Sequence, residues 1–297
     1  MISLEIYLRK IPNDYLYKRK YLDKHSNSIE VLILGSSHTY YGINPYFSKF
    51  KIFNAAYVSQ SLNFDLAIFK KYKNNWRKLK YIVIPVDYFS LYETLENGSE
   101  HWRVKNYNIY YAIKINSNYW NNFEVLNGNF SGNISRLKSH LFNQKPDINC
   151  NKLGFGTNHN SKDGKNLFIT GKINAKIHTA ILENNVFLSK NIQTLKSIIA
   201  LAKINNTKII FITSPAYYSY RKNLNAKQLN STLNQIKLLS SKYKHTFYYN
   251  LLADSTFLAN DYYDANHLNE IGAIKLTSKL NRIISSNNNI KSSILAK

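Results

Sequence analysis

The chain has 297 residues, 44% of them hydrophobic and 14% aromatic, which indicates a globular protein rather than a disordered one. Its single cysteine, Cys150, excludes an internal disulfide framework and a cysteine-based metal site. No apolar run approaches the roughly 18–20 residues that a membrane span needs, and the N-terminus lacks the apolar core of a signal peptide. The sequence as written therefore predicts a cytoplasmic protein, and a cell-envelope location would require a start further upstream.

The charge is strongly basic, because 40 Lys and Arg residues stand against 17 acidic residues and give a net charge of +23. Such a charge is typical of proteins that bind polyanions. The basic residues are scattered, however, and Asn is about as frequent as Lys and Arg together, which indicates a bias of composition. We therefore expect no specific nucleic-acid partner. Attraction to an anionic membrane surface or to an acidic glycan remains open.

Apolar runs predict strands that alternate with helices. The first half of the chain is expected to hold strands at 28–35, 51–54 and 79–86, and a helix at 61–75. The second half is expected to hold helices at 184–206, 225–243 and 269–285, and strands at 207–215 and 245–251. This alternation predicts an α/β three-layer sandwich, in which helices cover both faces of a mainly parallel sheet.

The same pattern predicts how the chain is organised. We expect a single α/β domain at 28–285, preceded by an N-terminal extension at 1–27 and followed by a flexible tail at 286–297. Between about 97 and 183 the sequence loosens into Asn, Gly, Ser and aromatic residues with only short helical hints. This segment is expected to be an irregular, partly helical insertion over the edge of the sheet.

A polar motif, Gly35-Ser36-Ser37-His38, directly follows the first predicted strand. In open α/β sheets, ligands bind at the carboxyl ends of the strands, so these side chains are candidates for a site. A serine there is a nucleophile only if a base reaches it. For the motif alone, the alternative is a polar turn.

A second motif, Asp264-Ala265-Asn266-His267, stands just before the last predicted helix. An aspartate three residues before a histidine can hold one imidazole nitrogen while the other nitrogen faces a crevice, which is the role of the acid in a catalytic triad. The alternative is a helix-capping aspartate beside an exposed histidine. A metal site would need further ligands that the sequence does not offer nearby.

Together these residues resemble the SGNH, or GDSL-type, hydrolase family of esterases and acyltransferases. In that family the nucleophilic serine lies in a Gly-Asp-Ser block after the first strand, and the base and its acid lie in an Asp-x-x-His block before the last helix. The resemblance places the nucleophile at Ser37, with Ser36 where the family has Asp, the base at His267 and the acid at Asp264. It implies a flavodoxin-like fold and a reaction without a cofactor or metal.

The second and third blocks of the family match more loosely. The second supplies a backbone N–H to the oxyanion hole from a glycine, and Ser59 stands in its place. The resemblance therefore implies the backbone N–H groups of Ser37 and Ser59 as oxyanion donors. The third block, Gly-x-Asn-Asp, is replaced by a segment with Pro85 and Asp87. Because an ionised Asp87 would repel an oxyanion, we expect it to point away or a different donor to serve.

Other side chains are expected to surround the substrate. The candidates for substrate binding are His38, Asn54, Gln60, Asp87 and Tyr217. His38 is either a donor in the oxyanion hole or a hydrogen-bonded turn residue. Aromatic residues that could stack on sugar rings are Tyr40, Tyr41, Trp102, Tyr110, Tyr111 and Trp120. The alternative for these aromatic residues is that they form the core of the insertion.

We expect a serine-dependent esterase or O-acyltransferase that acts on acyl esters, acetyl esters first of all, of a cell-surface glycan. The Gly-Ser-Ser block with a degenerate third block resembles the family branches that modify cell-envelope polymers. The partner would be a glycan or an acylated small molecule, with an acyl-donor protein or a membrane surface as further partners. The alternative is a non-catalytic module of the same fold that binds glycan or assists polymer assembly, which the degenerate third block favours.

Overall fold

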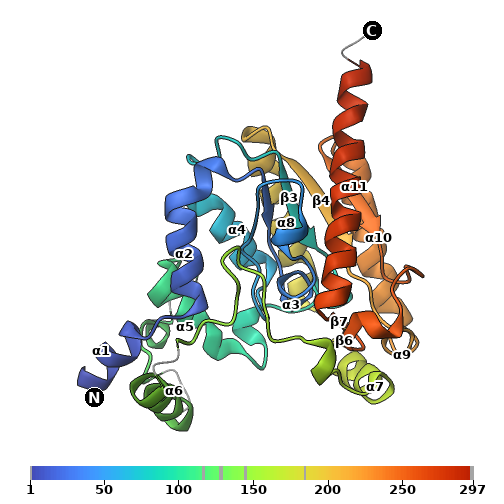
Figure 1. Ribbon diagram of the computed structural model, residues 1–297. Coiled ribbons are helices and arrows are strands. Elements are labelled where there is room, and N and C mark those ends of the chain that lie inside the picture. Colours follow the sequence, from blue (N-terminus) through green and yellow to red (C-terminus); the bar gives the residue numbers. More distant parts are fainter. Residues whose placement is uncertain (1, 116–117, 127–129, 144–145, 184, 295–297) are drawn as a thin grey trace.

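The computed structural model describes residues 2–115, 118–126, 130–143, 146–183 and 185–294. Its centre is a sheet of five parallel strands in the order β2-β1-β3-β4-β5 (Figure 1). The strands are β1 (Val31–Ile33), β2 (Ile52–Asn54), β3 (Tyr81–Pro85), β4 (Lys208–Thr213) and β5 (Thr246–Asn250). This is the order of flavodoxin-like sheets, whose ligands bind at the carboxyl edge where the strand order reverses, here between β1 and β3. The predicted α/β fold with a parallel central sheet is confirmed.

Both faces of the sheet are buried, because successive residues of a strand point to opposite sides. On one side, strand residues pack with α4 (Leu62–Lys71), α8 (Val186–Ile204) and α10 (Ala226–Lys242), and this larger cluster includes Leu32, Phe53, Ile82 and Phe211. On the other side, Val31, Val83 and Ile210 pack with Leu276 and Leu280 of the last helix, α11 (Glu270–Ile294). The sheet is therefore the middle of three layers.

The N-terminal segment folds against this core. It forms α1 (Ile2–Lys10) and α2 (Asp14–His25), which the sequence analysis did not predict as helices. Tyr15 and Leu22 of α2 belong to the larger core cluster. Glu5 of α1 accepts hydrogen bonds from the backbone N–H groups of Glu124 and Val125 in the insertion. The predicted extension at 1–27 is thus packed on the domain and contributes to its interior.

The segment predicted as an irregular insertion contains two full helices, α6 (Phe130–Asn143) and α7 (Leu167–Ile177). Shorter helical turns precede and separate them: η3 (Leu95–Asn97), η4 (His101–Arg103), α5 (Val104–Asn106), η5 (Tyr107–Tyr111), η6 (Tyr119–Asn122) and η7 (Ser161–Asp163). The helical content is higher than expected. For α7 the reason is that it buries the small residues Gly171 and Ala175, so its sequence lacks the usual inward row of large apolar residues.

The C-terminal part brings the last motif to the sheet. A hairpin of β6 (Tyr262–Asp264) and β7 (His267–Leu268), which was not predicted, precedes α11. Because α11 runs to Ile294, most of the predicted flexible tail is helical, and Lys208 Nζ anchors it by donating to the Asn287 carbonyl at 2.8 Å. Short helices elsewhere are η1 (Ser26–Ser28), α3 (Ser37–Tyr40), η2 (Pro45–Phe47), α9 (Tyr218–Arg221) and η8 (Ala259–Asp261). Within the described ranges, no helix has the length and apolarity that crossing a membrane requires.

Candidate active site

Ser37 begins the short helix α3 directly after β1, at the carboxyl edge of the sheet. The chain leaves β1 through Gly35, whose φ of +106° lies in the region that favours glycine. A Cβ atom on Gly35 would lie 2.2 Å from Cδ of Pro85, so a side chain here would also collide with β3. The glycine therefore permits the sharp turn that directs the chain from β1 to Ser37.

Ser37, His267 and Asp264 are joined by hydrogen bonds. Ser37 Oγ lies 2.8 Å from Nε2 of His267, although 230 positions separate the two residues. Nδ1 of His267 lies 3.0 Å from both carboxylate oxygens of Asp264. The β6-β7 hairpin carries Asp264 and His267 to α3 and so brings the two predicted motifs together. This arrangement can move a proton from Ser37 to His267 while Asp264 holds the imidazole.

The surroundings of Asp264 favour its charged form. Burial acts to raise the pKa of this carboxyl, but the neighbouring His267 imidazole and the hydrogen bonds to the carboxylate together outweigh burial and hold the pKa of Asp264 well below its usual range. The backbone N–H groups of Asn266 and His267 also donate to Oδ1, at 3.1 and 2.9 Å. A carboxylate held in this way stays ionised and keeps its orientation toward Nδ1.

Two backbone N–H groups near Ser37 are unpaired. Those of Ser37 and Ser59 donate no hydrogen bond to any group in the described part of the chain. Ser59 has a φ of 57°, a left-handed conformation that glycine adopts more easily. The Ser59 loop is tied to the Gly35 turn, because Tyr57 N–H donates to the Gly35 carbonyl at 3.1 Å. Unpaired N–H groups in this position are suited to stabilising an oxyanion.

Both carboxylate oxygens of Asp87 are held by groups of the protein. Its Oδ2 lies 2.7 Å from Nδ1 of His38, and its Oδ1 accepts from the backbone N–H of Ser214 at 2.7 Å. Nε2 of His38 lies 3.0 Å from the amide nitrogen of Asn266. Because that amide donates to Nε2, Nδ1–H of His38 donates to Asp87. Both ring nitrogens of His38 are thus bonded to protein groups, which favours the second of its two expected roles, the hydrogen-bonded turn residue.

The side chains of three further substrate-binding candidates contact other groups of the protein. Asn54 is fully buried, and its amide nitrogen donates to the carbonyls of Thr39 and Ile43 at 2.8 and 2.9 Å. The Gln60 amide nitrogen donates to Asp65 at 2.6 Å, and its oxygen accepts from the Tyr107 hydroxyl at 2.8 Å. Tyr217 packs against Phe168 and Tyr262. Asn54, Gln60 and Asp87 are thus bonded to groups of the protein, while Gln60 also lines the pocket described next. Contact of Asn54, Gln60, Asp87 and Tyr217 with substrate stays a prediction.

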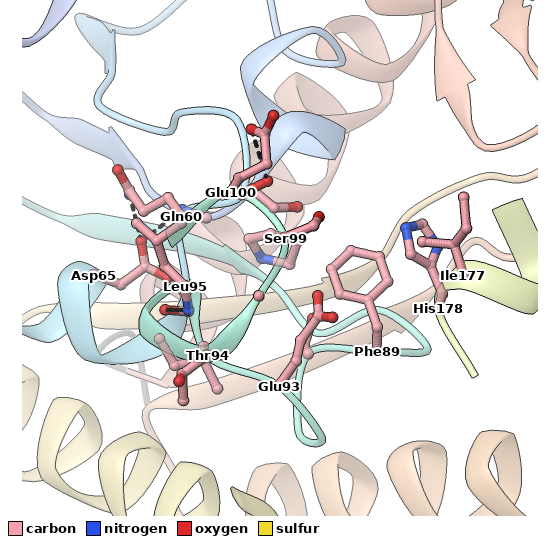
Figure 2. Close-up of a pocket in the computed structure, with 18 residues that line it drawn as sticks. Gln60, Asp65, Phe89, Glu93, Thr94, Leu95, Ser99, Glu100, Ile177 and His178 are labelled. Atoms are coloured by element: carbon pink, nitrogen blue, oxygen red, sulfur yellow. Dashed lines mark hydrogen bonds between the residues drawn. The ribbon is translucent and has the colours of Figure 1, made fainter. Parts of the chain in front are cut away.

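A pocket of about 120 Å³ opens beside the Ser37 turn and is lined by Gly35, Ser36 and Ser59. Figure 2 shows Gln60 and Asp65 at one end of it, and Phe89, Ile177 and His178 at the other. Burial raises the pKa of Asp65 to about 7, although hydrogen bonds from Gln60 and from the Gly35 N–H oppose the shift. The pocket thus borders Ser59 and Ser36, the residue before Ser37, and extends beneath the Ser59 loop.

Two histidines of the insertion lie close to the hydrogen-bonded series and were missed by the sequence analysis. The ring centroid of His159 lies 5.2 Å from that of His267, and His178 lies 6.5 Å from His38. Burial lowers the pKa of each to about 3, helped by the neighbouring His267 for His159 and by His38 for His178. Both are therefore neutral at neutral pH.

Asn266, within the second motif, was also missed, and its position beside His267 was the available signal.

The six aromatic candidates for sugar stacking are separated in the structure. Tyr110 and Tyr111 belong to the larger core cluster, which was the alternative considered for them. Trp120 is exposed in η6, while Tyr40, Tyr41 and Trp102 line a second pocket. In the ranges that the structure describes, no group of three or more His, Cys, Asp or Glu side chains is arranged to hold a metal ion.

Comparisons with known proteins add little at the level of sequence. No protein-family model matches the chain, and no curated protein matches it. Among solved structures, a protein of Bacteroides fragilis named as a candidate acylhydrolase is 12% identical, with 90% of this chain and 96% of that chain covered and a TM-score of 0.44. A protein of Streptococcus pneumoniae named for platelet activating factor is 14% identical, with coverages of 95% and 96% and a TM-score of 0.42. Overlaps this weak carry no argument about activity, which must come from the side chains of this chain.

Proposed function

We propose that the protein is a serine-dependent hydrolase or transferase of acyl esters, of the SGNH type. The observation that carries the proposal is the hydrogen-bonded series Ser37–His267–Asp264 at the carboxyl edge of the sheet. The two motifs that resemble the family's first and last blocks supply these three residues. The unpaired N–H groups of Ser37 and Ser59 complete the parts that acyl transfer requires.

In this proposal Ser37 Oγ attacks the carbonyl carbon of the ester, and Nε2 of His267 takes the proton. The imidazolium that forms is stabilised by Asp264, which accepts from Nδ1–H. The N–H groups of Ser37 and Ser59 bind the oxygen that becomes negative. His267 then gives its proton to the departing alcohol, and the acyl group stays on Ser37 until water or a sugar hydroxyl, deprotonated by His267, removes it.

The pocket beneath the Ser59 loop is the space for the acyl group. It begins at Ser36 and Ser59, where the carbonyl would sit, and its volume of about 120 Å³ suits a short acyl chain such as acetyl. We propose an O-acylated glycan as the substrate, because aromatic and amide side chains surround the neighbouring pocket that contains Tyr41 and Trp102. Whether water or a sugar accepts the acyl group depends on which of them reaches Ser37.

Labelling with a serine-directed fluorophosphonate tests the proposal. We expect the purified protein to be modified once, at Ser37, as mapped by peptide mass spectrometry. Ser37→Ala should abolish the label, whereas Ser36→Ala, which alters the neighbouring hydroxyl, should retain it. Absence of labelling together with absence of turnover of a nitrophenyl acetate would refute the enzyme, and the non-catalytic glycan-binding module would then be the better account.

A further inference from the structure

A second pocket, here called the arginine pocket, adjoins the proposed active site. It has a volume of about 320 Å³ and is lined by Tyr15, Tyr41, Tyr57, Trp102, Arg103 and Asn158, among others. Val58, next to Ser59, also lines it. The ring of Tyr41 lies 6.3 Å from that of His267, between centroids. A ligand in this pocket would therefore be separated from the proposed base by one aromatic ring.

The arginine pocket holds buried hydrogen-bond donors. Among the described residues the Tyr15 hydroxyl makes no hydrogen bond of ordinary length, although it is only 4% exposed, and the side chains of Arg103 and Asn106 lie beside it. Arg103 donates through Nε to Glu100, and its guanidinium also faces the Tyr15 hydroxyl. A buried hydroxyl without a partner costs free energy unless a ligand or water satisfies it. The pocket is therefore prepared for a molecule that presents acceptors.

The Asp14 carboxylate, an acceptor in the same pocket, is already satisfied. Oδ1 of Asp14 accepts from the N–H groups of Asn149 and Cys150, at 2.9 and 3.1 Å, and its Oδ2 accepts from the Tyr57 hydroxyl at 2.8 Å. The guanidinium of Arg103 stacks on Trp102, 4.4 Å from the ring centroid. Guanidinium donors suit a carboxylate, and aromatic walls suit the C–H faces of a sugar ring.

We infer that the arginine pocket binds an acidic sugar, a pyranose that carries a carboxylate, in the polymer whose ester is presented to Ser37. The role of the arginine pocket as a substrate subsite rests on the proposed function, but its binding of an acidic sugar does not. The net charge of +23 would attract such a polymer over a longer range. Arg103 binds the carboxylate, Tyr15 donates to a ring or hydroxyl oxygen, and Tyr41 and Trp102 enclose the ring.

Calorimetric titration of the Ser37→Ala protein with trigalacturonate tests this inference without requiring turnover. We expect saturable binding that is at least tenfold tighter than that of the neutral galactose trimer. Arg103→Gln should weaken it at least tenfold and Tyr15→Phe at least threefold. Trp120→Ala, which removes an exposed tryptophan outside the pocket, should leave it unchanged.

Tyr15→Phe separates binding from folding, because it deletes a buried hydroxyl that makes no hydrogen bond of ordinary length to the described residues and should not lower the melting temperature. Equal binding of both trimers, no binding, or binding that Tyr15→Phe leaves intact would overturn the inference. Binding as expected in a protein that takes no fluorophosphonate label would retain the arginine pocket and refute the proposed esterase.

A second, independent inference concerns the outer face of α7, defined as Phe168, Ile169, Ile173 and Ile177. The exposed fractions of these residues are 62%, 60%, 51% and 66%. The helix packs inward through small residues, and a Cβ on Gly171 would lie 2.3 Å from Ser219 Oγ of α9. Its large apolar residues are therefore directed outward, which is the reverse of an ordinary surface helix.

The charge on α7 indicates what covers this face. Lys172 and Lys176 are exposed on the same helix, and the stretch 166–177 contains no acidic residue. Helices α1, α6 and α7 lie at the same end of the molecule (Figure 1), and α6 also exposes Phe130 and Phe142. A second copy of the chain would bring two charges of +23 together, so self-association through this face is disfavoured.

We propose that the outer face of α7 docks on an anionic lipid surface. Exposed isoleucines would enter the boundary of the bilayer while the lysines meet the headgroups, as in helices that lie in a membrane interface. Ile177 and His178 line the pocket beside Ser36, so docking would place that pocket at the lipid surface.

Co-sedimentation with vesicles tests this second inference. Vesicles of phosphatidylcholine with about 30% phosphatidylglycerol should bind the protein, and pure phosphatidylcholine vesicles should bind it at least tenfold less. The double variant Ile169→Asn/Ile173→Asn should lose at least tenfold in binding. Ile204→Asn, at an isoleucine of α8 that is even more exposed, at 81%, should not. Unchanged binding of the double variant, or a dimer in solution that the double variant dissolves, would overturn the inference.

Discussion

At the scale of single residues, Ser59 adopts a left-handed backbone conformation that is usual for glycine but not for serine. Its φ of 57° costs a non-glycine residue on the order of 1 kcal/mol, yet it leaves the N–H free beside the Ser37 turn. Its hydroxyl contributes only a 3.3 Å hydrogen bond to Glu100. A serine where the family that the sequence resembles has glycine therefore retains a free backbone N–H, the group that we propose binds the oxyanion.

Ser59→Gly should accordingly keep activity within about threefold of the wild-type kcat/KM, because the donor is a backbone group. The free energy of unfolding should change by less than about 1 kcal/mol, since relief at φ offsets the greater freedom of the unfolded chain. Ester hydrolysis and urea denaturation measure the two quantities. A loss of activity of a hundredfold or more would show that the hydroxyl, rather than the N–H, is required.

Replacing the three hydrogen-bonded residues should separate their roles. Ser37→Ala and His267→Ala should each lower kcat for a nitrophenyl acetate by on the order of a million-fold at most, because they act as a unit. Asp264→Asn should be milder but still severe, since it disturbs the tautomer of His267. Steady-state kinetics with Ser36→Ala as the control measure this. If Ser36→Ala is inactive and Ser37→Ala is active, the nucleophile is Ser36.

At the scale of elements, the turn after β1 is held by α4. Oδ1 of Asp65 accepts both the Gly35 N–H, at 2.8 Å, and the Gln60 amide, at 2.6 Å, in a site where no described cation pairs with it. The pKa of Asp65 is raised to about 7, chiefly by burial. The ionised form of this carboxyl is thus costly to the fold, although its oxygen orients the loop that carries Ser37.

Asp65→Asn should therefore stabilise the protein at high pH. Between an unfolded pKa of about 3.9 and the folded value of about 7, the folded chain binds the extra proton, so rising pH lowers the wild-type stability. The variant keeps the accepting oxygen but has no carboxyl to ionise, so its stability does not fall in this way as pH rises. Its advantage in unfolding free energy should grow from pH 4 to pH 7 and then level off, as urea denaturation would show. The exposed Asp163→Asn is the control, and an advantage independent of pH would contradict the account.

The elements also show what the sequence could predict. Apolar runs such as Val31–Ile33 and Tyr81–Pro85 are buried on both faces, so each strand was recognisable without knowledge of its neighbours. The two motifs were recognisable from their positions: the motif with Ser37 follows a predicted strand, and the motif with His267 precedes a predicted helix. The partners of Asp87 and Asp65 were not, because those contacts join segments whose relative positions only the fold determines. Helix α7 was missed because its apolar residues face outward.

At the scale of the whole molecule, the net charge of +23 should produce weak, non-specific attraction to nucleic acid. Binding of this kind depends on counterion release and falls steeply as salt rises. Fluorescence anisotropy with two unrelated DNA duplexes should give equal affinities, which decrease at least tenfold between about 50 and 200 mM salt. Tight binding of one sequence over the other at physiological salt would contradict this expectation.

The distance of 230 positions between Ser37 and His267 has a consequence for synthesis of the protein. Chains are made at roughly 5–20 residues per second, so the serine leaves the ribosome roughly 10–50 seconds before the imidazole that would activate it. During that interval the hydroxyl has no base, and a chain that stops before the β6-β7 hairpin should be inert toward esters. With Ser37 as the proposed nucleophile, its reactivity would report on completion of the polypeptide, and a fluorophosphonate would label only molecules that have been finished and folded.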